Sequence, residues 1–210
     1  MTTPVAPGSD AEDRTGYYRR MQSAVEELLI LRGLFTREDM DNQIAAMDQR
    51  TYHSGSKVVA RAWVDPAYKA RLLADPRVAC AELGFNIGPL HLIILENKPD
   101  THNVVVCTLC SCYPRMLLGV PPHWYKSVEY RSRVVREPRK VLAEFGTALP
   151  GGIAIRVHDS TADMRYMVLP MRPAGTDGWN EDRLAELVTR DSLIGVGFAT
   201  SVVRAGAASP

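Results

Sequence analysis

The sequence lacks the features that mark several common classes of protein. Its 25 Lys and Arg residues nearly balance 24 Asp and Glu, and the formal net charge of +1 gives no electrostatic preference for nucleic acid or a membrane surface. No apolar run reaches the ~18 residues of a transmembrane helix. The first residues, MTTPVAPGSDAEDR, are acidic and do not resemble a secretory signal. We therefore expect a protein with no membrane span and no signal peptide, located in the cytoplasm.

Cysteine is scarce and unevenly placed. Only 4 cysteines occur in 210 residues, which excludes a disulfide scaffold. Three of them, Cys107, Cys110 and Cys112, are clustered in one short segment. Because 46% of the residues are hydrophobic, the chain can bury a substantial core. The cysteine cluster is thus the first candidate for a functional site.

The composition changes along the chain and predicts three regions. Residues 1–13 are rich in Pro, Ser, Gly and Asp and predict a disordered arm. Residues 14–55 predict an N-terminal helical arm that packs on a partner. The polar segment 51–57 predicts a hinge, and residues 56–210 predict a metal-binding catalytic domain.

Two helices are expected in the N-terminal arm. An apolar stripe runs from Met21 to Leu31, and Gly33 is placed to end this helix. Thr36, followed by Glu38 and Asp39, predicts the N-cap of a second helix.

Strands and helices mix in the main region without a regular alternation. Asp65-Pro66 and Asp75-Pro76 each predict the start of a helix. Aliphatic runs at His91–Glu96 and at 103–106, separated by a Lys-Pro-Asp turn, predict two consecutive strands. Further strands are expected at 153–158 and 165–169, and further helices at 136–145 and 181–189. These elements predict an α+β fold.

The spacing of the three cysteines limits how they can bind a metal. A Cys-x-x-Cys turn can direct Cys107 and Cys110 at one ion, whereas Cys112 can join them only if the backbone curls around that ion. The curl brings the amide nitrogens of Ser111 and Cys112 close. An amide nitrogen binds as an anion and therefore favours a strongly Lewis-acidic ion over zinc. An octahedral ion held by three sulfurs and two nitrogens keeps one position open for water or substrate.

Two alternatives remain open on spacing alone. A structural zinc site, completed by a nearby His or by Cys80, would make the chain part of an interaction protein. A redox-active or regulatory thiol site is the other alternative. Cys80 itself lies on an apolar helical face and is expected to be a buried core thiol.

The loop Val-Cys-Thr-Leu-Cys-Ser-Cys at 106–112 resembles the metal claw of nitrile hydratase alpha subunits and of the related catalytic gamma subunit of thiocyanate hydrolase. The resemblance extends from about Met21 to Val196 and includes four further segments in family order. These are KVVARAW at 57–63, PHWYK at 122–126, RVVREPR at 133–139 and RPAGTDGW at 172–179.

The resemblance implies a layered αββα catalytic domain with one low-spin metal ion. Its ligands would be the sulfurs of Cys107, Cys110 and Cys112 and the backbone nitrogens of Ser111 and Cys112. Thr108 matches the cobalt-type loop, so cobalt(III) is expected rather than iron(III). By the same resemblance, Cys110 is oxidised to a sulfinate and Cys112 to a sulfenate.

The implied activity is hydration of a nitrile to its amide. The attacking oxygen is left open between the Cys112 sulfenate, a metal hydroxide and free water. The family resemblance also implies a beta-type partner subunit that contributes arginines to the site, and a metallochaperone is a further possible partner. Nucleic acid and membranes are not expected as partners.

Two positions depart from the family pattern. Arg115 occupies a position where nitrile hydratases commonly carry Trp, and Met171 replaces a Gln. An Arg at position 115 resembles thiocyanate hydrolase, because a guanidinium attracts an anionic substrate. There are two alternatives to an anionic substrate. Arg115 could form a salt bridge to the partner chain, or the substrate could be a polar or heteroaromatic nitrile such as toyocamycin. Arg165 is a candidate to offset the negative charge of the claw.

Overall fold

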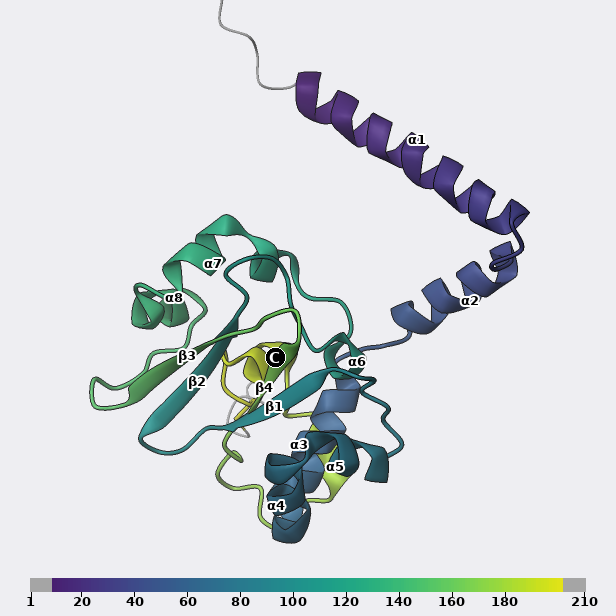
Figure 1. Cartoon of the computed structure of the whole chain (residues 1–210). Coiled ribbons are helices and arrows are strands. Elements are labelled where there is room, and N and C mark those ends of the chain that lie inside the picture. The colour runs from purple at the N-terminus through teal and green to yellow at the C-terminus, as the bar shows by residue number, and fades with distance from the viewer. Residues whose placement is uncertain (1–8, 202–210) are drawn as a thin grey trace, which may run out of the picture. The chain divides into compact units, whose positions relative to one another are not determined.

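The computed structural model describes residues 9–201, and it divides the chain into two units, Met1–Met47 and Asp48–Pro210 (Figure 1). In the first unit, helix α1 spans Ser9–Leu31 and helix α2 spans Arg37–Asp48. Residues 9–13, which we predicted as disordered, belong to α1, whereas residues 1–8 lie outside the described residues.

The predicted end of the first helix and the predicted start of the second are confirmed. Gly33 adopts a φ of 68°, a conformation that ends α1 at low cost only for glycine. The Thr36 hydroxyl accepts a hydrogen bond of 3.0 Å from the Asp39 amide, and the Asp39 carboxylate accepts one of 2.8 Å from the Thr36 amide. Thr36 is therefore the N-cap of α2.

The predicted hinge at 51–57 is wrong, because helix α3 spans His53–Val64 and buries Gly55 and Ser56. A Cβ on Gly55 would lie only 3.0 Å from Leu193 Cδ1, so the missing side chain permits close packing. The Ser56 hydroxyl donates a hydrogen bond of 3.1 Å to the carbonyl of Val188. Small and satisfied polar groups thus allow a polar segment to lie inside the core.

Helices α4 (Pro66–Ala74) and α5 (Pro76–Glu82) begin where the sequence predicts. Asp65 accepts a hydrogen bond from the amide of Tyr68, and Asp75 accepts from the amides of Arg77 and Val78. Each Asp-Pro pair therefore combines an N-cap with a proline in the first turn.

Four strands form two parallel pairs. Strand β1 (His91–Glu96) pairs with β4 (Met164–Leu169), and β2 (Thr101–Val106) pairs with β3 (Ala154–Asp159). The predicted strands are thus confirmed, although β1 and β2 do not pair with each other despite the short turn between them. Parallel pairing requires long connections, and the chain between β2 and β3 provides one that carries several helices.

The remaining helices surround these strands, and the fold is α+β as predicted. They are α6 (Arg115–Leu118), the 3-10 helix η1 (His123–Lys126), α7 (Val128–Arg133), α8 (Pro138–Glu144), α9 (Glu181–Ala185) and α10 (Arg190–Ile194). Helices α4 and α5 pack against β1, and α8 packs against β3 (Figure 1). Helix α10 contacts β2 and β4. None of the helices in the described part of the chain is both long enough and apolar enough to cross a bilayer.

Candidate metal centre

The cysteine loop begins where strand β2 leaves the core. Val104, Val105 and Val106 are buried, and the Val106 carbonyl accepts a hydrogen bond of 2.7 Å from the Ser160 amide beyond β3. The burial of the three cysteines then decreases outward: Cys107 is buried, Cys112 is half-buried and Cys110 is exposed. The loop is therefore anchored in the core at one end and presents sulfur to the surface.

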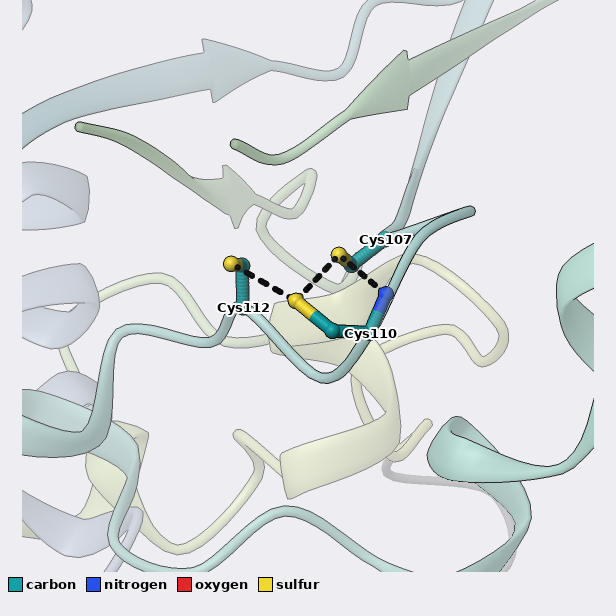
Figure 2. A group of neighbouring side chains, drawn as sticks. All are labelled: Cys107, Cys110 and Cys112. Carbon is teal, nitrogen blue, oxygen red and sulfur yellow. Dashed lines mark hydrogen bonds between the residues drawn. The ribbon is translucent and has the colours of Figure 1, made fainter. Parts of the chain in front are cut away.

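The loop curls so that its three sulfurs meet (Figure 2). The Sγ atoms of Cys107 and Cys110 lie 3.4 Å apart, and those of Cys110 and Cys112 lie 3.2 Å apart. All three sulfurs lie within 4.8 Å of one another, and within the described residues no other group of three or more His, Cys, Asp or Glu side chains is so arranged. The Cys110 amide also donates a hydrogen bond of 3.2 Å to Cys107 Sγ.

The sulfurs differ strongly in acidity. Hydrogen bonds from the Cys112 and Cys107 thiols, together with the backbone amides of Ser111 and Cys112, lower the pKa of Cys110 to about 7. Burial and the neighbouring sulfurs raise the pKa of Cys112 to about 12. The exposed Cys110 sulfur thus becomes an anionic thiolate, the form that binds metals, at a lower pH than the Cys112 sulfur.

The distances between the sulfurs test which metal geometry the loop fits. With metal–sulfur bonds of about 2.3 Å, a tetrahedral site separates its sulfurs by about 3.8 Å, whereas ligands at right angles lie about 3.3 Å apart. The observed 3.4 and 3.2 Å match the right-angled arrangement. The donor set therefore fits a square-planar or octahedral ion better than a tetrahedral zinc.

Two side chains that the sequence did not single out for the site hold the loop from outside. The Asp159 carboxylate accepts hydrogen bonds from the Thr108 amide at 2.9 Å and from the Thr108 hydroxyl at 2.5 Å. The Arg131 guanidinium of α7 donates one of 3.3 Å to the Thr108 carbonyl. Asp159 follows a predicted strand. This position indicates a contact with the cysteine loop only once the parallel pairing of β2 and β3 is known.

Aromatic residues support the loop from inside. The Tyr125 hydroxyl donates a hydrogen bond of 2.9 Å to the Cys112 carbonyl, and the Tyr130 hydroxyl donates one of 2.7 Å to the Val105 carbonyl. The rings of Tyr125 and Tyr130 pack edge-on against Trp124. The backbone on either side of the cysteines is therefore held in place before any metal binds.

The other candidate residues lie at different distances from the cysteines. Arg115 is exposed at the start of α6, three positions after Cys112. The Arg165 charge acts on Cys112 and favours its thiolate, although burial dominates and keeps that pKa raised. Arg165 Nε is also buried without a hydrogen-bond partner in the described part of the chain. Arg165 lies near the start of β4, whereas Met171 follows the end of this strand. Met171 lies beside His102, near the start of β2, and not beside the cysteines.

Cys80 does not belong to the group. Its side chain is fully buried in the core, and burial raises the pKa of its thiol to about 12. The expectation of a core thiol is confirmed, and the zinc alternative loses this candidate as its fourth ligand.

Comparisons with known proteins agree with this architecture. Residues 17–197 match the family model described as nitrile hydratase, alpha chain. The cobalt-containing nitrile hydratase alpha subunit of Pseudonocardia thermophila is 49% identical over 96% of this chain and 100% of its own length. The thiocyanate hydrolase gamma subunit of Thiobacillus thioparus is 45% identical over 90% of this chain and 83% of its own length.

Solved structures give the same result. An iron-type nitrile hydratase variant from Comamonas testosteroni Ni1 superposes with a TM-score of 0.82 at 43% identity, covering 93% of this chain and 95% of that one. A recombinant thiocyanate hydrolase with partially modified cobalt centres superposes with a TM-score of 0.80 at 44% identity, covering 88% and 93%. The chain belongs to the nitrile hydratase alpha-chain family.

Proposed function

We propose that this chain is the catalytic subunit of a cobalt-type nitrile hydratase, which hydrates a nitrile to the corresponding amide. The observation that carries the proposal is the sulfur triad of Cys107, Cys110 and Cys112, whose spacings of 3.4 and 3.2 Å fit ligands at right angles. The relative from Pseudonocardia thermophila, named as cobalt-containing, supports the choice of metal.

The proposed ligands are the three sulfurs and the backbone nitrogens of Ser111 and Cys112. A bound low-spin cobalt(III) ion supplies a strong Lewis acid with one exchangeable position. Both amides also help to lower the pKa of Cys110. The hydrogen bonds of Asp159 and Arg131 to Thr108 restrict the loop. Little conformational entropy is therefore lost when the proposed sulfur and nitrogen ligands converge on the ion.

Oxidation of two cysteines is part of the proposal. Cys110 is exposed and has a pKa near 7, which makes its thiolate the most accessible to oxidants and the proposed sulfinate. Cys112 is half-buried and is the proposed sulfenate. Their oxygens would lie at the surface where a substrate approaches, and Cys110 and Cys112 are therefore the proposed catalytic cysteines.

The cysteine face requires a partner to become an enclosed site. Cys110 is exposed, and the adjacent Leu109 side chain is 88% exposed. On an open surface, bulk water weakens the electrostatic interactions that would bind and polarise a nitrile. We infer that a beta-type subunit covers this face and contributes arginines to the oxidised sulfurs. A metallochaperone and a cytoplasmic location, suited to a chain with free cysteines, belong to the same proposal.

Thiocyanate hydrolysis is a second candidate because of Arg115. Its side chain is exposed three positions after Cys112, where a guanidinium can attract an anionic substrate. The gamma subunit of thiocyanate hydrolase is almost as similar to this chain as the nitrile hydratase is. Both candidates use the same metal centre and differ in the substrate that Arg115 would select.

Metal analysis and activity of the complex with its partner subunit test the proposal. We expect about one cobalt per chain and turnover of a nitrile, with both lost in Cys107→Ser, because a hydroxyl does not replace a thiolate for this ion. The matched control, Cys80→Ser, should retain the metal. Stoichiometric zinc without nitrile or thiocyanate turnover would return the chain to the class of structural zinc proteins.

A further inference from the structure

A cavity of about 450 Å³ lies away from the cysteine loop, at the other end of the strands. Its floor includes His102, near the start of β2, whereas Cys107 follows the end of the same strand. At a rise of about 3.3 Å per residue, the two positions are separated by roughly 17 Å. The cavity is therefore not part of the claw site.

The cavity is mainly apolar and is shaped by residues with little conformational freedom. Its walls include Leu149, Pro150, Ile153, Pro170, Pro173 and Phe198. Phe198 is 53% exposed, so part of its ring remains available to a ligand. Prolines have a fixed φ and no flexible side chain, which favours a preformed cavity over one that a ligand must open. The volume lies within the range of small-molecule sites, about 300–1,000 Å³.

The floor is rigid because its polar groups are paired. Asn97 donates through Nδ2 to His102 Nδ1 at 3.3 Å, and His102 donates through Nε2 to the Gly195 carbonyl at 2.8 Å. The Asn97 carbonyl oxygen accepts a hydrogen bond of 2.8 Å from the Asn103 amide. A ligand therefore meets satisfied polar groups below and apolar walls around it, so the floor does not require a polar ligand.

The charge of the lining selects the kind of ligand. Lys98 and Arg172 line the cavity, and none of its lining residues is Asp or Glu. The Arg172 guanidinium is occupied by Thr176 and by the Trp63 carbonyl. Lys98 is exposed and forms no ion pair within the described part of the chain. An apolar cavity with an unpaired cation at its mouth favours an apolar body that carries a negative charge.

We propose that this cavity binds a small aromatic carboxylate, with its ring between the proline-rich wall and Phe198 and its carboxylate at Lys98. The proposal does not depend on the chemistry of the cysteine loop. It assigns a second ligand site to a chain whose claw would carry the catalysis.

Benzoate and its neutral analogue benzamide are the probes, titrated by calorimetry into the full-length chain in complex with its partner subunit. Lys98→Met should weaken benzoate binding about threefold to fivefold, as expected for one exposed charge pair, and leave benzamide binding unchanged. Lys57→Met is the matched control, because Lys57 is exposed but does not line the cavity.

Two further variants test the walls. Ile153→Trp should fill the cavity and abolish binding of both probes. Phe198→Ala removes an exposed ring and should weaken both probes about threefold to tenfold, which keeps the test valid if Ile153→Trp does not fold. Equal effects of Lys98→Met on both probes would overturn the charge assignment. Absence of benzoate binding by the complex would overturn the site, since the cavity would then be covered by protein.

Discussion

The Asp159 carboxylate accepts two hydrogen bonds from Thr108, of 2.9 Å from the amide and 2.5 Å from the hydroxyl, although the two residues are 51 positions apart. The parallel pairing of β2 and β3 aligns Val106 with Asp159 and so produces this contact. Because Thr108 lies between Cys107 and Cys110, the carboxylate fixes the backbone on which two of the sulfurs depend. Asp159 is therefore a positioning residue for the metal loop.

Replacing Asp159 by Asn should loosen that loop. An amide has only one acceptor oxygen, so one Thr108 donor exchanges its protein partner for water, at a cost of about 0.5–1.5 kcal/mol. We expect a corresponding fall in unfolding free energy, measured with urea, and less cobalt per chain by elemental analysis. Asp163→Asn is the control, because Asp163 is exposed in the following loop. Unchanged cobalt content in Asp159→Asn would show that the loop does not need the carboxylate.

The cysteine cluster could be predicted from the sequence because its members are close together along the chain. Cys107, Cys110 and Cys112 lie within six positions, and three sulfurs at this spacing can meet only if the backbone curls. Asp159 was not identified, since its role depends on which distant strand pairs with β2. The hinge predicted at 51–57 failed for a related reason. Gly55 and Ser56 are polar or small in sequence, and only packing against Leu193 reveals that they are core residues.

Gly195, the C-cap of α10, should tolerate substitution poorly. Its φ is 88°, and a Cβ would lie 2.0 Å from the Asn103 carbonyl oxygen. Gly195→Ala therefore adds a backbone clash to the left-handed strain, and we expect a loss of more than about 3 kcal/mol in unfolding free energy.

Gly178 is the matched control for this effect. Its φ of 74° carries the same strain, but nothing lies within 4 Å of a Cβ there. Gly178→Ala should cost only about 1–2 kcal/mol. Equal losses in the two variants, measured by urea unfolding, would mean that the contact with Asn103 relaxes.

The thiol acidities predict a pH-dependent pattern of alkylation in the reduced, metal-free chain. The pKa of Cys110 is lowered to about 7, so its thiolate predominates above that pH and is lost as the pH falls below it. Iodoacetamide labelling of Cys110, followed by peptide mass spectrometry, should be half-maximal near pH 7. Cys80 should stay unlabelled until the chain unfolds, because it is fully buried and its pKa is about 12. Labelling of Cys80 at the rate of Cys110 would contradict this assignment.

Mass spectrometry of the active complex tests the proposed oxidation states. The Cys110 peptide should carry two added oxygens and Cys112 one, because the exposed thiolate is the more accessible to oxidants. An active preparation in which all three cysteines remain reduced would remove the sulfenate from the proposed site.

Arg115→Trp separates the two candidate substrates. If the guanidinium binds an anionic substrate, the substitution should lower kcat/KM for thiocyanate. The loss of transition-state stabilisation should be about 1.5–3 kcal/mol, the value of a charge-assisted hydrogen bond. The kcat/KM for a neutral nitrile should change little.

If Arg115 instead pairs with an acidic residue of the partner, kcat/KM should fall for both substrates together, and the subunits should dissociate faster because a charge is left unpaired. Kinetics with both substrates and the subunit dissociation rate therefore form one experiment. Equal values for wild type and variant in all three measurements would make Arg115 a solvated surface residue and leave thiocyanate without support from this chain.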